Sequence, residues 1–114
     1  MSFPIAVYSK PLLVSGNAFV NNVDTNAVYL VYNLTGATGS PNLVFTIAES
    51  DPISPGTLIA GGQTASTGTI STNTSGILPL TGIGSGCVLV SWALSGGTFA
   101  NANLTITRKI SGLS

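Results

Sequence analysis

Residues 87–110 read CVLVSWALSGGTFANANLTITRKI, and their hydrophobic pattern decides the class of fold. In the first part, large apolar side chains occupy every second position: Val88, Val90, Trp92 and Leu94. In the last part, the same alternation places large side chains on one face: Leu104, Ile106 and Ile110. A period of two residues is typical of a β-strand with one buried face, so we expect strands over 87–94 and 103–110.

Two glycines, Gly96 and Gly97, lie between these strands and predict a hairpin. A plain two-residue turn would put the apolar faces of the two strands on opposite sides of the sheet, because side chains alternate along a strand. We therefore expect either a three-residue loop with a left-handed glycine or a bulge within residues 100–103. The cross-strand pairs would then be Val90 with Leu104 and Val88 with Ile106.

Further strands are expected outside this region. Residues 27–34 (AVYLVYNL) are apolar on both faces, which is typical of a central strand covered on both sides. Residues 42–49 (NLVFTIAE) place Leu43, Phe45 and Ile47 on one face. Shorter candidates lie at 3–9, 11–15, 18–23, 56–60, 67–72 and 76–80. Glycine- and proline-rich turns separate the candidates, and no helical period is present.

Many short strands separated by turns are typical of a sandwich or barrel. We expect one domain over residues 1–114, folded as an all-β, antiparallel sandwich of about eight strands, jelly-roll-like or Ig-like, without significant helix. Residues 1–15 contain Pro4 and Pro11, which lack the N–H that a sheet ladder requires. This segment is expected to be either an edge strand or an extended arm that adds a strand to a neighbour.

Charged side chains are scarce. The 114 residues include three Lys or Arg, three Asp or Glu and no His, which is 5% of the chain against roughly 25% in an ordinary domain. Nucleic-acid binding requires clustered Lys and Arg and is not expected. An enzyme is not expected either, because the many serines and threonines have no base to activate them. Since charge normally keeps a monomer dispersed, we expect much of the surface to be covered by other protein, as in a homo-oligomer.

The single cysteine, the first residues and the length of the apolar runs bear on disulfides, secretion and membrane insertion. Cys87 is the only cysteine and precedes apolar residues, so a buried thiol and no disulfide within the chain are expected. The first residues show no basic segment before an apolar run, so no secretory signal is expected. No apolar run approaches the roughly 18 residues of a membrane span. N-x-S/T triplets at Asn33, Asn73 and Asn103 are interpreted as chance products of a Ser-, Thr- and Asn-rich chain.

Glu49, Ser50 and Asp51 form the acidic cluster of the chain. Two carboxylates of this spacing on a strand can point the same way, but they precede Pro52 in a turn-rich stretch. We interpret them as solvated charges that cap a sheet edge. With Asp24 as the only other acid, no metal site is expected. Residues 82–86 lack the Lys-Ser/Thr ending of a phosphate-binding loop, and no cofactor is expected.

The aromatic and cationic residues supply the candidates for partner contact. Trp92, in the middle of an alternating strand, is expected in the core. Tyr29 lies on the second face of a doubly apolar strand and is a better candidate for contact with another protein. Arg108 is expected to lay its stem on the sheet and its charge in water. The candidate partner-binding residues are Phe3, Tyr8, Lys10, Tyr29, Arg108 and Lys109.

Residues 42–51 (NLVFTIAESD) and 87–107 (CVLVSWALSGGTFANANLTIT) resemble segments of small β-sandwich virion proteins of tailed bacteriophages. In those proteins a strand of the form φ-x-F-x-I-x-x-S-D and a hairpin of the form R/V-x-V-x-W-x-L-S-G-G/T-x-x-F recur. The matching residues here are Phe45, Ile47, Ser50, Asp51, Val90, Trp92, Leu94, Ser95, Gly96 and Phe99. The resemblance covers roughly residues 40–110 and includes no catalytic residue.

The resemblance implies a virion structural protein, and within that class we expect a capsid decoration (cement) protein. Such proteins lie on the outer capsid surface between capsomers, often as trimers, where they bind the major capsid protein and stabilise the particle. Two other classes stay open: a carbohydrate- or receptor-binding module, for example of a tail fibre, and a repeat unit of a surface or fibrous array. A sugar site would show two or more exposed aromatic rings beside amides, from among Tyr29, Tyr32 and Trp92.

Overall fold

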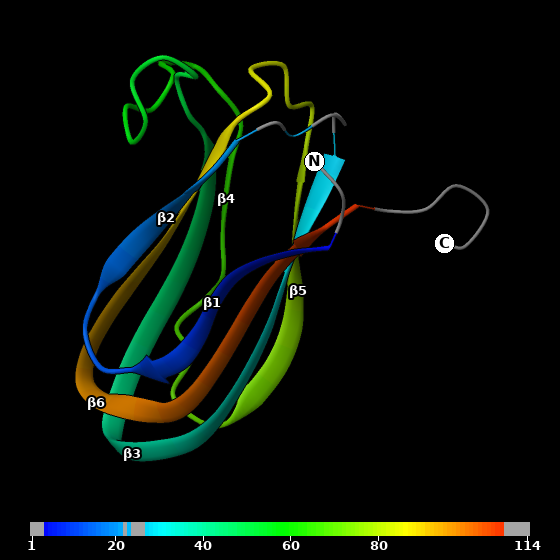
Figure 1. The fold of residues 1–114 in the computed structure, drawn as a ribbon. Coiled ribbons are helices and arrows are strands. Elements are labelled where there is room, and N and C mark those ends of the chain that lie inside the picture. Colours follow the sequence, from blue (N-terminus) through cyan, green and yellow to red (C-terminus); the bar gives the residue numbers. More distant parts are fainter. Residues whose placement is uncertain (1–3, 22, 24–26, 109–114) are drawn as a thin grey trace.

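The computed structural model describes residues 4–21, 23 and 27–108. Within this part of the chain there is no helix, and therefore none that is long and apolar enough to cross a bilayer. Six strands form a single antiparallel sheet (Figure 1). The strands are β1 (Ile5–Leu12), β2 (Gly16–Val20), β3 (Ala27–Glu49), β4 (Thr64–Ser66), β5 (Thr74–Thr81) and β6 (Val88–Thr107).

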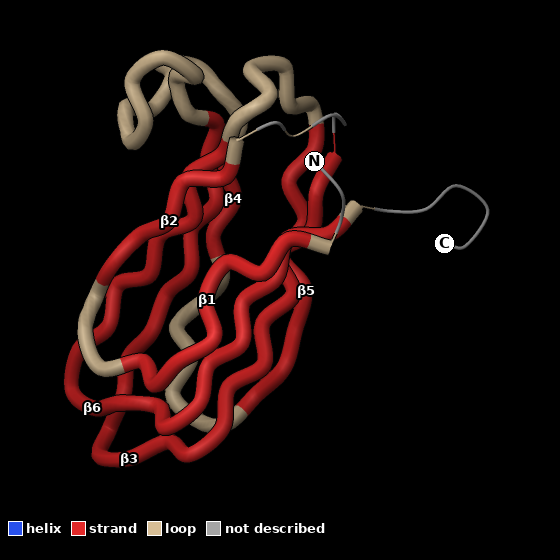
Figure 2. Tube along the Cα trace, in the orientation of Figure 1, coloured by secondary structure: helices blue, strands red, loops and turns tan. Residues whose placement is uncertain are grey.

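The architecture depends on two long strands, β3 and β6, of 23 and 20 residues. They pair antiparallel along their whole length, from Tyr29 opposite Thr107 to Glu49 opposite Val88. Both bend at the same level, at the lower end of the molecule in Figures 1 and 2. The bend divides the sheet into two half-sheets that enclose one core.

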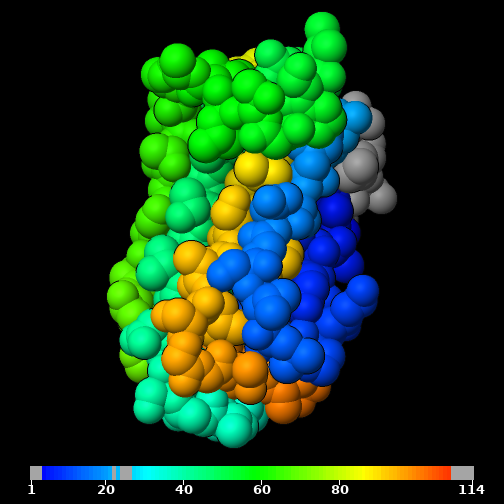
Figure 3. Space-filling model, turned by 90° about the vertical axis from the view of Figure 1, so that its left-hand side faces the viewer, coloured from blue at the N-terminus to red at the C-terminus, as the bar shows by residue number. Residues whose placement is uncertain are grey.

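The shorter strands extend each half-sheet. In the first half-sheet, β1 pairs with the later part of β6 and β5 pairs with the early part of β3. In the second half-sheet, β2 pairs with the early part of β6 and β4 pairs with the later part of β3. The strand order is therefore β1-β6-β3-β5 in the first half-sheet and β2-β6-β3-β4 in the second. The edge strands β1 and β2 lie side by side on one flank (Figure 3).

A one-residue bulge keeps the apolar side chains of β3 inside on both sides of the bend. Before the bend the buried residues have even numbers, as in Leu30 and Leu34, and after it they have odd numbers, as in Phe45. The register changes between Gly39 and Asn42, where β3 holds one residue more than β6. Because side chains alternate with period two, one extra residue reverses the phase and keeps the apolar face on the core.

The bend itself is made by glycines on both strands. Gly36 and Gly39 in β3 have φ of 70° and 77°, and Gly96 in β6 has φ of 76°. This left-handed conformation is inexpensive only for glycine. The two strands also approach closely there, since Gly39 lies opposite Gly97 and a Cβ on Gly96 would overlap the carbonyl oxygen of Ser40. Both the φ angles and the close approach therefore require glycine at the bend.

The core is continuous between the two half-sheets, with Phe45 and Phe99 as the largest fully buried side chains. Two aromatic contacts connect the half-sheets. The rings of Tyr8 and Trp92 have centroids 5.0 Å apart, and those of Tyr32 and Phe45 are 5.1 Å apart. These contacts hold the half-sheets together at positions away from the bend.

Two predictions of buried residues are confirmed. Trp92 is buried, and its indole Nε1 donates a hydrogen bond to the carbonyl of Val14 at 3.2 Å. Cys87 is a buried free thiol, and its Sγ donates to Oδ1 of Asn21 at 3.1 Å. In both cases a polar atom on a largely apolar side chain finds a partner, as burial requires.

The predicted hairpin is wrong. Residues 87–107 do not reverse at Gly96, and β6 passes through it as one bent strand. Gly96 has the left-handed φ that we expected. β3 has a bulge between Gly39 and Asn42, and the pairing of β6 with β1 also shifts register between Phe99 and Ala102, in the region where a bulge was expected. Val90 lies opposite Ile47 instead of Leu104. The physical reason is that β3 carries matching glycines at the same level, which lets two long strands bend together.

The all-β, antiparallel, helix-free character is confirmed for the described residues, but a sandwich of eight strands is not, because the strands number six in one sheet. The predicted strands at 27–34 and 42–49 form one continuous strand, β3, so the turn expected between them is not present. Residues 56–60 and 67–72 are loops with single bridges, Ser50 to Leu58 and Leu43 to Ile70, and the short strand β4 between them was not predicted.

Two further segments with predicted roles are strands of the first half-sheet, one central and one at its edge. Residues 27–34 are central, between β5 and β6, as expected, but only one face is covered: Val28, Leu30 and Leu34 are buried inside, whereas Tyr29 is half-buried on the outer face. Residues 5–12, from the segment expected as an arm or an edge strand, form β1 at the edge of the first half-sheet, and Leu12 is fully buried. Residues 1–3 lie outside the described part.

We expect Gly96→Ala to lower the free energy of unfolding by about 3 kcal/mol, because the new Cβ combines left-handed strain with overlap of the Ser40 carbonyl. Gly61→Ala is the matched control, since Gly61 has the same φ of 76° and no atom within 4 Å of a built Cβ. It should cost only about 1 kcal/mol. Urea denaturation of both variants measures the difference, and equal losses would refute the close approach at the bend.

Candidate functional site

Glu49, at the end of β3, is a buried carboxylate that two loops enclose. Its Oε2 accepts a hydrogen bond from the backbone N–H of Gln63 at 2.8 Å. Its Oε1 accepts from the backbone N–H groups of Gly84 at 2.7 Å and Ser85 at 3.1 Å. Gln63 precedes β4, while Gly84 and Ser85 belong to the loop between β5 and β6. One side chain thus fixes both loops to the end of the long strands.

The same contacts determine the protonation of Glu49. The N–H of Gln63 lowers the pKa of the carboxyl below its ordinary value of 4.5, with further lowering from Gly84 and Ser85. Burial acts in the opposite direction but does not prevail. Glu49 is therefore ionised at neutral pH. A carboxylate in this state holds loops and is not poised to donate a proton.

The interpretation of the acidic cluster as solvated charges is wrong for Glu49. Backbone N–H groups replace water around its carboxylate, so the charge is buried but fully partnered. Asp51 is partly exposed, and its Oδ1 accepts from the backbone N–H groups of Ile53 at 2.8 Å and Ser54 at 3.2 Å. The two carboxylates thus accept hydrogen bonds from different segments of the backbone.

Asp51 and Ser50 give the loop between β3 and β4 a defined shape. The N–H of Asp51 donates to the carbonyl of Thr57 at 2.8 Å, which closes residues 51–57 into a compact turn. Ser50 is fully buried, and its Oγ accepts from the N–H of Gly56 at 3.3 Å. At the tip of this turn Ile53 is 89% exposed to solvent. Figure 3 shows the loop projecting at the end of the molecule opposite the bend.

Sequence reasoning did not identify this exposed tip. Ile53 lies between Pro52 and Pro55 in the stretch DPISPG, a pattern that predicts only a turn. The available signal was an isoleucine within a run of turn-forming residues. Leu58 and Ile59 in the same loop are also exposed, as are Leu13 and Val14 between β1 and β2 and Ile77 on β5.

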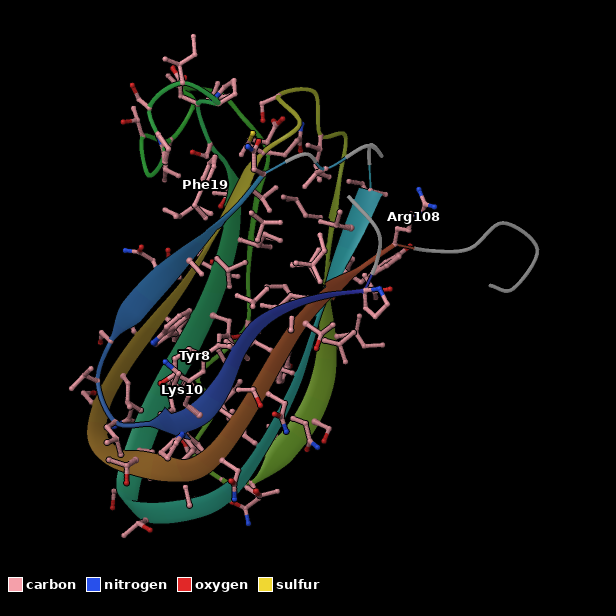
Figure 4. All side chains as sticks on the ribbon, viewed as in Figure 1. Tyr8, Lys10, Phe19 and Arg108 are labelled. Atoms are coloured by element: carbon pink, nitrogen blue, oxygen red, sulfur yellow. The ribbon has the colours of Figure 1, made fainter. Side chains whose placement is uncertain are left out.

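The candidate partner-binding residues fall in two places. Tyr8 is half-buried against Trp92, and its hydroxyl donates to the carbonyl of Pro11 at 2.7 Å. Lys10 is exposed close to it on β1, whereas Arg108 is exposed beyond the far end of β6 (Figure 4). Tyr29 lies on the outer face of the first half-sheet, opposite Thr107. The remaining two candidates, Phe3 and Lys109, lie outside the described residues.

The outer face of the first half-sheet carries a row of polar residues across four strands: Ser9, Asn103, Asn33 and Ser75. Ser9 Oγ donates to Oδ1 of Asn103 and Ser75 Oγ donates to Oδ1 of Asn33, both at 2.7 Å. Of the aromatic residues considered for a sugar site, Tyr29 shares this face. Tyr32 and Trp92 pack on the core instead.

The described residues contain no group of three or more His, Cys, Asp and Glu side chains that is arranged to hold a metal ion. Every buried side-chain nitrogen or oxygen in this part of the chain has a hydrogen-bond partner. The ordered polar atoms at the loop end therefore act on the protein's own backbone, as Glu49 does.

We expect Glu49→Gln to lower the free energy of unfolding by about 2 kcal/mol at pH 7, because an amide cannot accept on both ends as a charged carboxylate does. The folded pKa lies below the unfolded one, so the contribution of Glu49 is complete above about pH 4.5 and decreases as the pH falls through the folded pKa. The difference between wild type and Glu49→Gln should therefore shrink on acidification.

Urea denaturation at several values of pH between 2 and 7 measures this difference. Asp51→Asn is the control, since the amide keeps an oxygen that accepts from Ile53 and Ser54. A gap between wild type and Glu49→Gln that stayed constant down to pH 2 would contradict the assigned pKa shift.

Comparison with known proteins adds no evidence on family or function. The chain matches no protein-family model, no curated protein and no solved structure. The likeness to virion proteins of tailed bacteriophages accordingly rests on residues 42–51 and 87–107 alone.

Proposed function

We propose that this protein is a virion structural protein, a capsid decoration protein that binds the major capsid protein on the outer shell and stabilises the particle. The observation that carries the proposal is the combination of a nearly uncharged surface with exposed apolar side chains such as Ile53 and Ile77, which is 63% exposed. A surface with little charge favours association with other protein. The resemblance in residues 42–51 and 87–107 indicates which class of protein that is.

The fold supports a binding role. The bent sheet works as a two-layer sandwich in this proposal, and counting each long strand once in each half-sheet gives eight strand segments. Such a scaffold holds its loops and outer faces in fixed positions, which lowers the entropy lost on docking. The sparse charge also favours an oligomer, and a homotrimer is the form that the resemblance implies.

Tyr29 is the candidate that this proposal places in contact with the capsid. Its ring is half-buried on an outer sheet face, between Pro79 and Thr107 on the neighbouring strands, and it is not part of the core cluster. Arg108 directly follows Thr107, the residue opposite Tyr29, whereas Lys10 lies on the edge strand β1 of the same half-sheet. An aromatic ring in such a position is a common anchor of protein interfaces.

Cosedimentation with purified shells built from the major capsid protein tests this proposal. We expect wild-type protein to pellet with the shells and to raise their temperature of disruption. Tyr29→Ala should weaken binding about tenfold, the effect of losing one interface anchor. Val44→Ala, at a half-buried position on the outer face of the second half-sheet, is the control and should bind normally. Wild-type protein that stays in the supernatant at all concentrations would refute the proposal.

A carbohydrate-binding module is the second candidate, and the row Ser9, Asn103, Asn33 and Ser75 on the same face as Tyr29 favours it. Amides beside an aromatic ring suit sugar hydroxyls and the apolar face of a pyranose. However, one aromatic residue accompanies the amides where two were expected. Binding of the isolated protein to a glycan array, abolished by Asn33→Ala, would favour this candidate over the decoration protein.

A further inference from the structure

Residues 82–86, between β5 and β6, form a lid over one end of the core (yellow, at the top of Figure 1). Ile83 is buried and belongs to the core cluster between the half-sheets. Gly82 and Gly86 have left-handed φ angles of 75° and 76°, which turn the chain at both ends of the segment. The carbonyl of Gly86 accepts from the N–H of Val23 at 2.8 Å. We name residues 82–86 the core lid.

The middle of the core lid is held by one side chain of another strand. The N–H groups of Gly84 and Ser85 both donate to Oε1 of Glu49, at 2.7 and 3.1 Å. The hydroxyl of Ser85 donates within its own segment, to the carbonyl of Cys87 at 3.0 Å. Among the described residues, the Glu49 carboxylate is therefore the polar group that connects the middle of the core lid to the long strands.

The loop between β3 and β4 is held in a different way. The N–H of Gln63 donates to Oε2 of Glu49 at 2.8 Å, but the backbone N–H of Glu49 also donates to the carbonyl of Gln63 at 2.9 Å. The N–H of Ile59 donates to the carbonyl of Glu49 at 3.2 Å. These backbone bonds do not change when the side chain is protonated. Loss of the carboxylate would therefore free the core lid and leave this loop attached.

A protonated carboxyl does not fit this site. The three groups that face the carboxylate oxygens are all N–H donors, and an ionised carboxylate only accepts. A proton on either oxygen adds an O–H donor that faces at least one N–H. A buried donor without an acceptor is costly, and the remaining hydrogen bonds lose the strength that the charge gave them. Protonation therefore favours a side chain that leaves the site for water.

We propose that Glu49 is the latch of an acid-sensitive lid: when its carboxyl is protonated, residues 82–86 leave the end of the core while both half-sheets stay folded. The half-sheets are joined by apolar packing and by the ring contacts of Tyr8 with Trp92 and Tyr32 with Phe45, and none of these depends on a carboxylate. Opening exposes Ile83 and the apolar surface beneath it. This inference goes beyond the proposed function and does not depend on it.

The direction of the pH dependence follows from the two states of Glu49. The hydrogen bonds of the closed form lower the pKa of the carboxyl below 4.5, whereas a solvated carboxyl in the open form has its ordinary pKa. The closed form is therefore fully favoured above about pH 4.5, and its advantage is lost as the pH falls through the lowered pKa. Because opening takes up one proton, the equilibrium constant for opening rises by at most about tenfold per pH unit.

Two other titratable side chains of the described residues lie on the segments around this carboxylate. Asp51 follows Glu49 on the same chain segment and accepts from N–H groups of its own turn. Cys87 directly follows the core lid, which itself contains only glycine, isoleucine and serine. Asp24 adjoins Val23 in the sequence but lies outside the described residues. The two aspartates are therefore the alternatives that an experiment must separate from Glu49.

The buried thiol of Cys87 can report the state of the core lid. Cys87 is 2% exposed, and its carbonyl accepts from the N–H of Ser50 and from the hydroxyl of Ser85, so it lies where the two loops meet. Its reaction with 4,4′-dithiodipyridine, which modifies thiols in acid as well, is measured between pH 2 and 7. The rate is divided by that of the urea-unfolded protein at the same pH. The fluorescence of Trp92 shows whether the core stays folded.

In wild type, the relative rate of Cys87 modification should rise below about pH 4.5, by up to about tenfold per pH unit, while the Trp92 fluorescence stays native. Glu49→Gln places an amide with the shape of the protonated carboxyl in the site. Its relative rate at pH 7 should exceed that of wild type about tenfold or more and should not follow the pH. Asp51→Asn and Asp24→Asn are the matched controls and should keep the wild-type profile.

Amide hydrogen exchange on wild type tests the core lid without any variant. The N–H groups of Gly84 and Ser85 should lose protection in the same range of pH in which Cys87 becomes reactive. The N–H of Glu49, which donates to the carbonyl of Gln63, should keep its protection.

Three results would overturn the proposal: a relative rate of Cys87 modification that does not rise while Trp92 stays native, a Glu49→Gln variant with the wild-type pH profile, or amides of Gly84 and Ser85 that stay protected until the whole sheet unfolds. If Asp51→Asn or Asp24→Asn abolished the pH dependence instead, that aspartate would be the latch and the role proposed for Glu49 would be wrong.

Discussion

The close passage of Gly96 against the carbonyl of Ser40 is the contact on which the rest of the structure depends. It lets β3 and β6 bend at the same level while they stay paired from Tyr29 to Glu49. The other four strands are added to this pair of long strands. Each half of the pair receives two short strands, and the two half-sheets enclose one core. The fold is thus dominated by contacts between residues far apart in the sequence.

The end of the ribbon opposite the bend is organised by Glu49. A chain with three acidic residues uses one of them inside the protein, where three backbone N–H groups hold its charge. A charged hydrogen bond is stronger than a neutral one, so a single carboxylate fixes two loops. Asp51 has a related task in the next loop, where it orients the backbone of Ile53. The two acidic side chains that the structure describes therefore hold the shape of the loops at this end of the molecule.

The arrangement of apolar and polar surface gives the molecule its functional character. Ile53 projects at the loop end, Tyr29 and Ile77 lie on an outer sheet face, and an apolar pocket separates β1 from β2. Binding by such surfaces gains free energy mainly from burial of apolar area, and it is insensitive to salt in comparison with contacts between charges. This mode of binding suits the proposed attachment to a capsid shell.

The sequence by itself determined which side chains face the core, because alternation of apolar residues reports the buried face of each strand. It also placed Trp92 and Cys87 in the interior and a left-handed glycine near the middle of 87–107. Only the tertiary structure decided which strand lies opposite which. Alternation carries no information about the partner strand, and a glycine pair permits a bend as readily as a reversal. For the same reason the ionised, buried state of Glu49 was not foreseen, since its partners at residues 63, 84 and 85 are backbone groups that no side-chain pattern reveals.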